Sequence, residues 1–358
     1  MDYLSYIPAA IFAFLLTLSL TVMALHFFPK WGLIDRPHKY GLKRKPIPYY
    51  GGLVLFAGFA ISTLLFVPYD VHVVSFLFAA GLLVATGFVD DYTGLSPHFR
   101  LFVQLIAALI LVLSGIGIMS ISNPLGDAIT FDYWRVTIES IGIYEISVVG
   151  AIFTVIWVMT LTNTMNFLDG LNGLPSGVAI IAGLTLFALS VRPDIHFDAS
   201  SQMPVATMSL ILASTALAFW LFDFYPAKIL MGDTGSTFLG FTIAVLAIFS
   251  GGKVATALLV LGFPILDTIW VILRRIVQGK SPMQGDLKHF HHRLLKIGLT
   301  DRQALMLIYL LSLMFGGIAV FLEGINKFYA LIAMGVLMII LGGLAVYLQG
   351  KKEAKDLA

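Results

Sequence analysis

The chain has 358 residues, of which 59% are hydrophobic and only 12% are charged. Soluble domains usually carry roughly 25% charged residues, and disordered chains combine high charge with few aromatic side chains, so this composition excludes both classes. The net charge of +2 does not indicate nucleic-acid binding, and the absence of cysteine excludes disulfides, thiolate metal sites and a cysteine nucleophile.

Apolar segments of membrane-spanning length follow one another along the whole chain. Because a spanning helix needs about 20 apolar residues, we predict an all-α polytopic membrane protein with about eleven transmembrane helices, ten being the alternative. The predicted helices cover residues 4–26, 51–69, 72–89, 99–120, 146–163, 174–191, 204–222, 235–250, 254–273 (interrupted by Pro264 and Asp267), 303–322 and 328–349. No soluble domain separates them, so residues 1–358 are predicted to form one integral-membrane domain.

The basic residues divide very unequally between the two sides of the predicted bundle. Eighteen of the 22 lysines and arginines fall on one side and four on the other. The positive-inside rule then predicts an N-terminus outside and a cytoplasmic C-terminus, and this alternation needs an odd number of spans. On the outer side, β-rich runs at 128–131 and 136–138 predict a small extracytoplasmic hairpin within 121–145.

Five predicted cytoplasmic connections hold nearly all of the polar residues: 27–50, 90–98, 163–174, 223–236 and 274–302. In the first, Lys43, Arg44 and Lys45 stand beside prolines and form a stiff cationic loop suited to phosphate. The alternative is that these charges serve only the positive-inside orientation.

Two adjacent carboxylates, Asp90 and Asp91, close the third predicted span, and Arg100 and Gln104 follow on the next helix. Adjacent carboxylates repel each other unless a cation lies between them or one stays protonated. Beside Mg²⁺ or a basic cluster both can ionise, and one can act as a base. A solvated helix end is the alternative.

The third connection repeats a polar residue at every third position: Asn163, Asn166, Asp169 and Asn172. On a helix this spacing predicts one shared face that offers oxygen ligands and amide donors with little charge. Capping of a helix end by Asn and Asp is the alternative.

The fourth connection carries a glycine-flanked turn at the start of the eighth span, Gly232-Asp233-Thr234. A helix N-terminus is an anion site, but Asp233 would repel a bare phosphate. The conflict is resolved if Asp233 holds Mg²⁺ and the metal holds the phosphates. An ordinary capped helix start is the alternative.

The fifth connection contains His289, His291, His292 and Arg293. We predict a short cytoplasmic helix that begins at Asp286 and stops at Gly298, followed by a capping box at Thr300 and Gln303. Phosphate or sugar contacts are favoured over zinc, because adjacent histidines on a helix point about 100° apart. Asp267, inside the ninth span, is predicted either to pair with Arg274 or Arg275 or to face the site.

Together these residues favour phosphoryl transfer between a lipid and a soluble substrate, because Mg²⁺ prefers carboxylates plus substrate phosphates. The chain has no P-loop or kinase signature, so ATP is not indicated. The alternative of another class is an ion-coupled secondary transporter, whose polar sites would lie near the membrane midplane rather than at one face.

The motifs, in this order, resemble those of the polyprenyl-phosphate N-acetylhexosamine-1-phosphate transferase family, glycosyltransferase family 4. They are Asp35-Arg36-Pro37 with Pro46-Ile47-Pro48 and Gly51-Gly52, Asp90-Asp91, the run 163–173, Gly232–Ser236 and His289–Leu294. The His-x-His-His-Arg-Leu form is similar to the WecA/TagO branch, which takes UDP-GlcNAc. An MraY-like transferase of phospho-MurNAc-pentapeptide is the alternative.

The resemblance implies Mg²⁺-dependent transfer of N-acetylhexosamine-1-phosphate, usually GlcNAc-1-phosphate, from a UDP-sugar to undecaprenyl phosphate. The products are undecaprenyl-diphospho-sugar and UMP, and the reaction initiates a cell-envelope polysaccharide such as lipopolysaccharide or teichoic acid. Mn²⁺ is an alternative metal. The resemblance also implies a bacterial inner membrane location, a cytoplasmic active site and a homodimer.

The site residues follow from the same resemblance. The implied metal ligands are Asp233 and Asn172. The implied catalytic residues are Asp90, Asp91, Asp169, Asp233, His291 and His292. The implied substrate-binding residues are Lys43, Arg44, Lys45, Asn166, Gly232, Thr234, His289 and Arg293. Asn172 stands where bacterial relatives commonly have Asp, and Tyr49-Tyr50 replace a more usual Arg-Met, so the identity of the sugar stays open.

Overall fold

The computed structural model describes residues 3–37, 44–121, 128–131, 133–138, 144–192, 202–250, 254–279, 289–322 and 324–356. A short 3₁₀ helix, η1 (Tyr3–Tyr6), leads into α1 (Ile7–Phe27). The helices that follow are α2 (Gly51–Phe66), α3 (Val71–Thr93), α4 (Pro97–Leu113), α5 (Val148–Leu168), α6 (Leu174–Ser190), α7 (Met203–Asp223), α8 (Gly232–Phe249), α9 (Val254–Val260), α10 (Gly262–Val277), α11 (Phe290–Ile297), α12 (Asp301–Phe321) and α13 (Gly324–Asp356).

The chain is an all-α polytopic membrane protein. Within the described residues, 7 helices are long and apolar enough to cross a membrane, namely η1 with α1, α3, α5, α7, α8, α12 and α13. Three shorter apolar helices, α2, α4 and α6, coincide with three more predicted spans. The predicted ninth span is divided into α9 and α10, but the predicted interruption at Pro264 and Asp267 is wrong, because both residues lie inside α10. The break falls at Leu261, and Pro264 lies in the first turn of α10, where its missing N–H costs no helical hydrogen bond.

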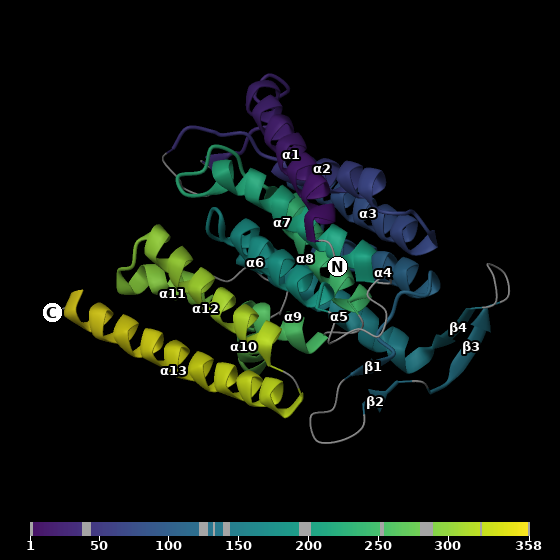
Figure 1. Ribbon diagram of the computed structural model, residues 1–358. Coiled ribbons are helices and arrows are strands. Elements are labelled where there is room, and N and C mark those ends of the chain that lie inside the picture. Colours follow the sequence, from purple (N-terminus) through teal and green to yellow (C-terminus); the bar gives the residue numbers. More distant parts are fainter. Residues whose placement is uncertain are drawn as a thin grey trace.

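Helix α8 lies at the centre of the bundle and contacts α2, α3, α5, α6 and α7 (Figure 1). It is buried along almost its whole length, and many of its residues are Gly, Ala, Ser or Thr. Small residues let helices approach closely where lipid supplies no hydrophobic drive for association. The start of α8, which carries Asp233, is therefore held by neighbours on several sides.

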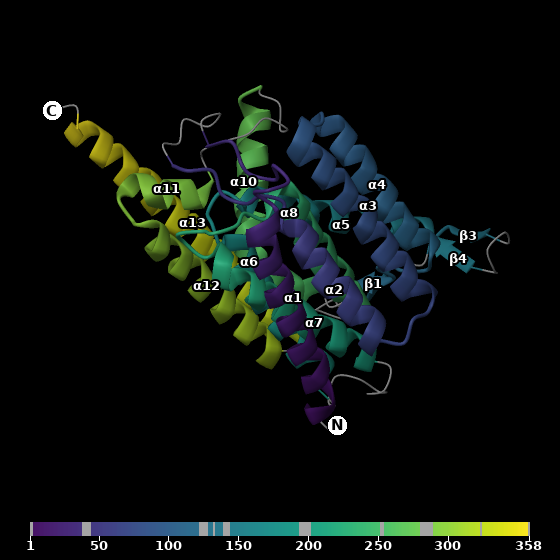
Figure 2. The same ribbon diagram turned by 90° about the horizontal axis from the view of Figure 1, so that it is seen from above.

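The two edges of the bundle are formed by α13 and by the α3–α4 pair, which lie opposite each other in both views (Figure 2). Most large apolar side chains of α13, such as Ile339 and Tyr347, are exposed. That exposure fits a helix whose outer face meets lipid.

Several helix ends differ from the sequence prediction by three residues or more, and two of them have a clear physical cause. The fifth span was predicted to end at 163, but α5 continues to Leu168 because Asn163 and Asn166 find polar partners on neighbouring helices. The fourth was predicted to reach 120, but α4 ends at Leu113, and Gly115 then adopts a left-handed φ of 84° that stops the helix.

The loop after α4 forms two small antiparallel pairs rather than one hairpin. Strand β1 (Ser120–Ile121) pairs with β2 (Ile129–Thr130), and β3 (Arg135–Ile138) pairs with β4 (Tyr144–Ser147). The first predicted run therefore pairs back to the end of the α4 connection and the second pairs forward to the start of α5. Trp134, at a φ of 53°, turns the chain between the two pairs.

The end of α11 and the start of α12 follow the prediction. Gly298, at a φ of 112°, ends α11, and Thr300 with Gln303 forms the capping box of α12. The N-cap of α11 is His289, whereas the predicted N-cap, Asp286, lies outside the described residues.

Candidate active site

A polar cleft of about 470 Å³ lies beside the start of α8. Four of the five predicted cytoplasmic connections contribute to it, and the fifth does not line it within the described residues. Five aspartates and three arginines are among the lining residues: Asp35, Asp90, Asp91, Asp169, Asp233, Arg36, Arg44 and Arg100. The formal charge of the lining is therefore negative, which favours a cation.

The carboxylate of Asp91 occupies the N-terminus of α8. Its Oδ1 accepts the backbone N–H of Asp233 at 3.0 Å, and its Oδ2 accepts the N–H of Thr234 at 3.1 Å and the Thr234 hydroxyl at 2.6 Å. The anion site predicted at this helix start is thus filled by a side chain from α3. Thr234, which is predicted to bind substrate, is fully buried, and Asp91 is the acceptor of its hydroxyl.

Gly232 makes this contact possible. Its φ of 70° is left-handed, and a Cβ at this position would collide with Oδ2 of Asp91. The predicted role of Gly232 in substrate binding is therefore supplemented by a structural one, since it lets the Asp91 carboxylate reach α8.

Tyr49 and Tyr50, just before α2, also reach Asp91. The hydroxyl of Tyr49 donates to Oδ1 of Asp91 at 3.2 Å, and that of Tyr50 donates to its carbonyl oxygen at 3.4 Å. Burial raises the pKa of Tyr49, and the carboxylates of Asp91, Asp233 and Asp169 raise it further, so the hydroxyl keeps its proton as a donor. From the sequence alone, the two tyrosines stand out only as a departure from the motif pattern that the chain resembles.

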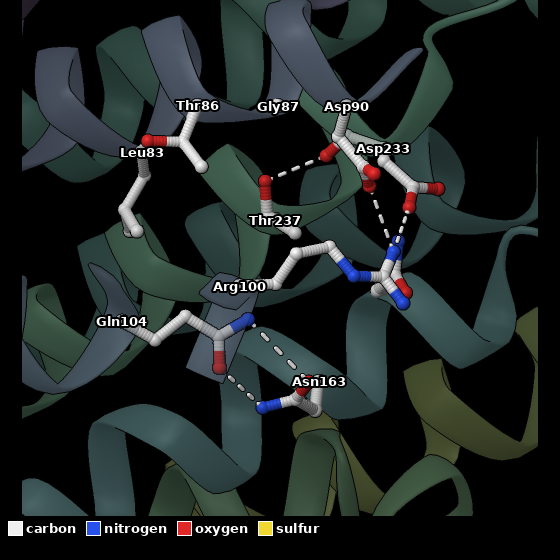
Figure 3. A pocket seen from close by; sticks show the side chains of 10 residues that line it. Leu83, Thr86, Gly87, Asp90, Arg100, Gln104, Asn163, Asp233 and Thr237 are labelled. Carbon is white, nitrogen blue, oxygen red and sulfur yellow. Dashed lines mark hydrogen bonds and ion pairs between the residues drawn. The ribbon is translucent and has the colours of Figure 1, made fainter. Parts of the chain in front are cut away.

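Asp90 and Asp233 converge on the guanidinium of Arg100, which comes from α4 (Figure 3). Nη1 of Arg100 lies 2.9 Å from Oδ2 of Asp90 and also donates to Oδ2 of Asp233. The other oxygen of Asp90 accepts the backbone N–H of Leu95 at 2.6 Å. Arg100 was outside the predicted site, although a charged residue inside an apolar segment was a signal that could have included it.

The four polar residues of the third connection do not share one face. Asn163 pairs with Gln104 of α4, with its Nδ2 2.6 Å from Oε1, and Asn166 donates to the Ser236 hydroxyl at 3.1 Å. Since α5 ends at Leu168, Asp169 and Asn172 lie in the following turn and line the cleft. Asn163 and Asn166 line a smaller neighbouring pocket instead.

Asp169 sits in a crowded acidic environment. Burial raises its pKa well above the usual range of an aspartate, and three neighbouring carboxylates raise it further, those of Asp223, Asp233 and Asp91. A cation in the cleft would therefore favour the ionised form of this side chain.

A second set of hydrogen bonds holds the turn that carries Asp169 and Asn172. The Ser176 hydroxyl donates to Asp223 at 2.7 Å, and the hydroxyl of Tyr309 donates to the carbonyl oxygen of Gly173. Trp220 in turn donates to the Tyr309 oxygen at 3.0 Å. Helices α6, α7 and α12 thereby fix the turn.

Asp267 pairs with His289 rather than with an arginine. Its Oδ2 lies 3.0 Å from Nδ1 of His289, and its Oδ1 accepts the N–H of Phe290 at 3.0 Å. The carboxylate thus caps the start of α11 and orients the imidazole, so neither predicted alternative, an arginine partner or a place in the cleft, is what the described residues show.

The three histidines form a compact group. The rings of His289 and His291 are parallel with centroids 5.8 Å apart, and those of His291 and His292 are 4.1 Å apart. His291 is buried, and its Nε2 points at Gly170, where a Cβ would collide with it. Burial and the two neighbouring histidines lower the pKa of His291, so this imidazole stays neutral. Within the described residues, His291 adjoins the Asp169–Asn172 turn, whose side chains line the cleft.

The predicted basic loop is placed in part. Arg44 lines the cleft and pairs with Asp35 at 2.5 Å. Lys45 is exposed and does not line the cleft. Lys43 lies outside the described residues, and Arg293 is half-buried on α11.

The cleft suits a magnesium ion that takes some of its ligands from the protein and the others from a substrate and water. The described residues contain no group of three or more His, Asp or Glu side chains arranged to hold a metal by themselves. Asp233 and Asn172, the two residues predicted as ligands, both line the acidic cleft. Mg²⁺ usually takes one or two protein oxygens and completes its shell with water and phosphate, so these donors fit it.

Comparison with known proteins gives one consistent result. Residues 73–251 match the model of Glycosyl transferase family 4. The chain is 31% identical to a decaprenyl-phosphate N-acetylglucosaminephosphotransferase from Mycolicibacterium smegmatis, over 85% of this chain and 78% of that protein. It is 29% identical to a probable undecaprenyl-phosphate N-acetylglucosaminyl 1-phosphate transferase from Bacillus subtilis, over 91% of this chain and 87% of the relative. An undecaprenyl-phosphate alpha-N-acetylglucosaminyl 1-phosphate transferase from Yersinia pestis is 28% identical over 89% and 85%.

Proposed function

The chain belongs to glycosyl transferase family 4, and on that premise we propose that it transfers N-acetylglucosamine 1-phosphate from UDP-GlcNAc to undecaprenyl phosphate. The products are undecaprenyl-diphospho-GlcNAc and UMP. The names of these three relatives support the sugar and the polyprenyl acceptor.

One observation carries the proposal: carboxylates, an amide and arginines from four separate connections meet in a single cleft at the ends of apolar helices. A lipid acceptor must stay in the bilayer while its phosphate reaches a water-soluble donor. A polar cleft at the end of a helix bundle lets both substrates meet without moving the lipid out of the membrane.

The reaction we propose is a single displacement. An oxygen of the lipid phosphate attacks the β-phosphorus of the UDP-sugar, the bond from that phosphorus to the bridging oxygen breaks, and UMP leaves. A phosphate monoester has a second pKa near 6, so a strong base is hardly needed. Asp90 is suited to position the lipid phosphate and to accept its proton.

The other residues act by binding and orientation. Asp233 and Asn172 would hold Mg²⁺, which would neutralise charge on the diphosphate. Asp91 keeps the start of α8 in place, so that Asp233 faces the cleft. Arg44 and Arg100 supply positive charge for the phosphates, and His289 and Arg293 on the α11 segment are suited to the sugar or diphosphate.

The proposal includes the setting of the enzyme. We infer a multi-pass protein of the bacterial inner membrane with its cleft toward the cytoplasm, where UDP-sugars are found. The basic-residue asymmetry of the connections supports this orientation. A homodimer is part of the same proposal.

The decisive test is a transfer assay with purified protein, undecaprenyl phosphate, Mg²⁺ and a panel of UDP-sugars, with UMP release as the readout. We expect release with UDP-GlcNAc, none after chelation of the metal, and none without lipid phosphate. UMP release with UDP-MurNAc-pentapeptide alone would overturn the choice of sugar. Exchange of labelled UMP into the UDP-sugar without lipid would overturn the single displacement but not the transfer itself.

A further inference from the structure

The guanidinium of Arg100 stands between two carboxylates that belong to different helices. Its Nη1 contacts Oδ2 of Asp90 at 2.9 Å and also Oδ2 of Asp233 (Figure 3). The end of α3, the first turn of α4 and the first turn of α8 thus share one positive charge.

Arg100 thus occupies the place between the two carboxylates where a divalent cation would bind. Two carboxylates that approach each other so closely repel unless a cation lies between them. Here one guanidinium nitrogen satisfies both, in a cleft whose lining is negative overall. The side chains of Arg100 and Asp233 are 33% and 32% exposed, so solvent and ions reach the contact.

We propose that Arg100 is the resting counter-ion of Asp233, and that a divalent cation must displace it from this carboxylate in order to bind. Arg100 then stays paired with Asp90, and its remaining donors face the substrate phosphate. By competing for Asp233, Arg100 sets the cation affinity of the cleft and keeps it low until a diphosphate brings further ligands. This rests on the proposed function, because it takes Asp233 as a cation ligand.

The surroundings give the displaced guanidinium room. A pocket of about 30 Å³, space for roughly one water molecule, adjoins the contact and is itself lined by Arg100. Polar atoms of Gln104, Asn163 and Thr237 line it as well (Figure 3). A short movement of Arg100 away from Asp233 therefore stays beside these polar side chains, although Leu83 and other apolar groups form part of the same wall.

Electron paramagnetic resonance of Mn²⁺ tests the proposal directly, without any turnover. Purified protein in detergent, with no UDP-sugar, is titrated with Mn²⁺, and the bound fraction gives Kd. We expect Arg100→Gln to lower the Kd about tenfold, as one partly screened charge at contact distance predicts. Arg100→Lys keeps the charge but loses the fork of guanidinium donors, so its Kd for Mn²⁺ should lie between those of the wild type and Arg100→Gln.

A matched control separates displacement from a general loss of positive charge. Arg44 lines the same cleft and pairs with a different carboxylate, that of Asp35. Arg44→Gln should change the Kd of Mn²⁺ by less than about twofold. An equal fall in Kd for both variants would overturn the displacement, as would an unchanged or higher Kd in Arg100→Gln.

Two further measurements keep the outcome readable. Asp233→Asn should weaken Mn²⁺ binding. If Asp233→Asn binds Mn²⁺ as tightly as the wild type, Asp233 is not a cation ligand and the proposed function loses its cation site. If Asp233→Asn binds Mn²⁺ more weakly but Arg100→Gln leaves the Kd unchanged, only the displacement of Arg100 is contradicted. If Arg100→Gln is less stable, its thermal midpoint should still rise more with Mn²⁺ than that of the wild type, because ligand binding stabilises in proportion to affinity. A smaller rise contradicts the proposal.

Discussion

Asp91 shows how a single side chain can set the geometry of the cleft. It joins the end of α3 to the start of α8 through three hydrogen bonds, and Tyr49 adds a fourth. An adjacent Asp-Asp pair suggests two equivalent acids, but only Asp90 has an oxygen paired with a cleft arginine. We therefore assign Asp91 to positioning and Asp90 to the substrate.

Gly232→Ala tests the contact between Asp91 and α8. The alanine must adopt a φ of 70° and its Cβ collides with Oδ2 of Asp91. We expect a loss of about 1–3 kcal/mol of stability, seen as a lower thermal midpoint, and loss of most transfer activity. Gly317→Ala in α12 is the control, because a Cβ there meets nothing within 4 Å. An equal thermal midpoint and equal transfer activity in the two variants would show that Gly232 is not needed for the contact between Asp91 and α8.

Asp233→Asn and Asn172→Asp test the proposed metal ligands. Loss of the Asp233 charge should reduce transfer at least about a hundredfold at limiting Mg²⁺. Asn172→Asp keeps an oxygen donor and adds charge, so transfer should stay within about tenfold of the wild type. UMP release across a Mg²⁺ titration checks both, with elution as a folded species as the control. Near-normal transfer by Asp233→Asn would remove it from the ligand set.

The buried imidazole of His291 makes stability depend on pH. Because its pKa in the folded protein lies below the unfolded value of about 6.5, the unfolded state binds more protons as the pH falls through this region. Stability is thus fully present above that pH and declines below it. His291→Gln should flatten the fall of the thermal midpoint between about pH 7.5 and 5.5. His289 and His292 are unchanged in this variant. If the thermal midpoints of the variant and the wild type fall in parallel as the pH is lowered, His291 is not the cause of the pH dependence.

At the scale of elements, α11 depends on a residue of another helix. This helix has only 8 residues, too few to be stable alone, and its start is capped by Asp267 of α10. The buried contact of Asp267 with His289 ties the histidine group to the membrane-embedded part of the chain.

Asp267→Ala leaves the N–H of Phe290 and Nδ1 of His289 without their acceptor. An unpaired buried donor costs about 1–3 kcal/mol, so the amides of 290–297 should exchange with deuterium roughly ten times faster or more. Asp267→Asn keeps an acceptor for Phe290 and should lie nearer the wild type. Hydrogen exchange read by mass spectrometry measures this, with the amides of α8 as an internal reference. Unchanged exchange in the alanine variant would mean that Asp267 does not hold α11.

Elements and site residues differ in how far the sequence predicts them. Span positions follow from local apolarity, so ten helices and the divided ninth were placed within several residues of their ends. The capping box at Thr300 is local too and was predicted correctly. The contact of Asp91 with Thr234 joins residues 143 positions apart, and the pairing of β1 with β2 depends on where α4 stops. No local pattern specifies such partners, so the contact of Tyr49 with Asp91 was not predicted. Arg100 did carry a local signal, a charge inside an apolar segment, but its two carboxylate partners could not be identified from the sequence.

For the whole molecule, the basic residues predict which way the bundle faces, and the site depends on that orientation. All four contributing connections fall on the side rich in Lys and Arg, whereas the β1–β4 region lies on the other. If the bundle were inverted, the cleft would open away from the cytoplasmic UDP-sugar. The orientation is therefore a condition of the proposed function as well as a feature of the fold.

The lack of cysteine makes this orientation directly measurable. Single cysteines at Lys45 and Lys228 on the predicted inner side, and at Tyr133 on the predicted outer side, all replace exposed residues. The thiol reagent should reach the outer face of the inner membrane but be unable to cross that membrane. With such a reagent, we expect labelling of position 133 in intact cells. Positions 45 and 228 should react only after the inner membrane is permeabilised, because the positive-inside rule retains basic connections in the cytoplasm. Labelling of 45 and 228 but not 133 in intact cells would invert the bundle and remove the cleft from its soluble substrate.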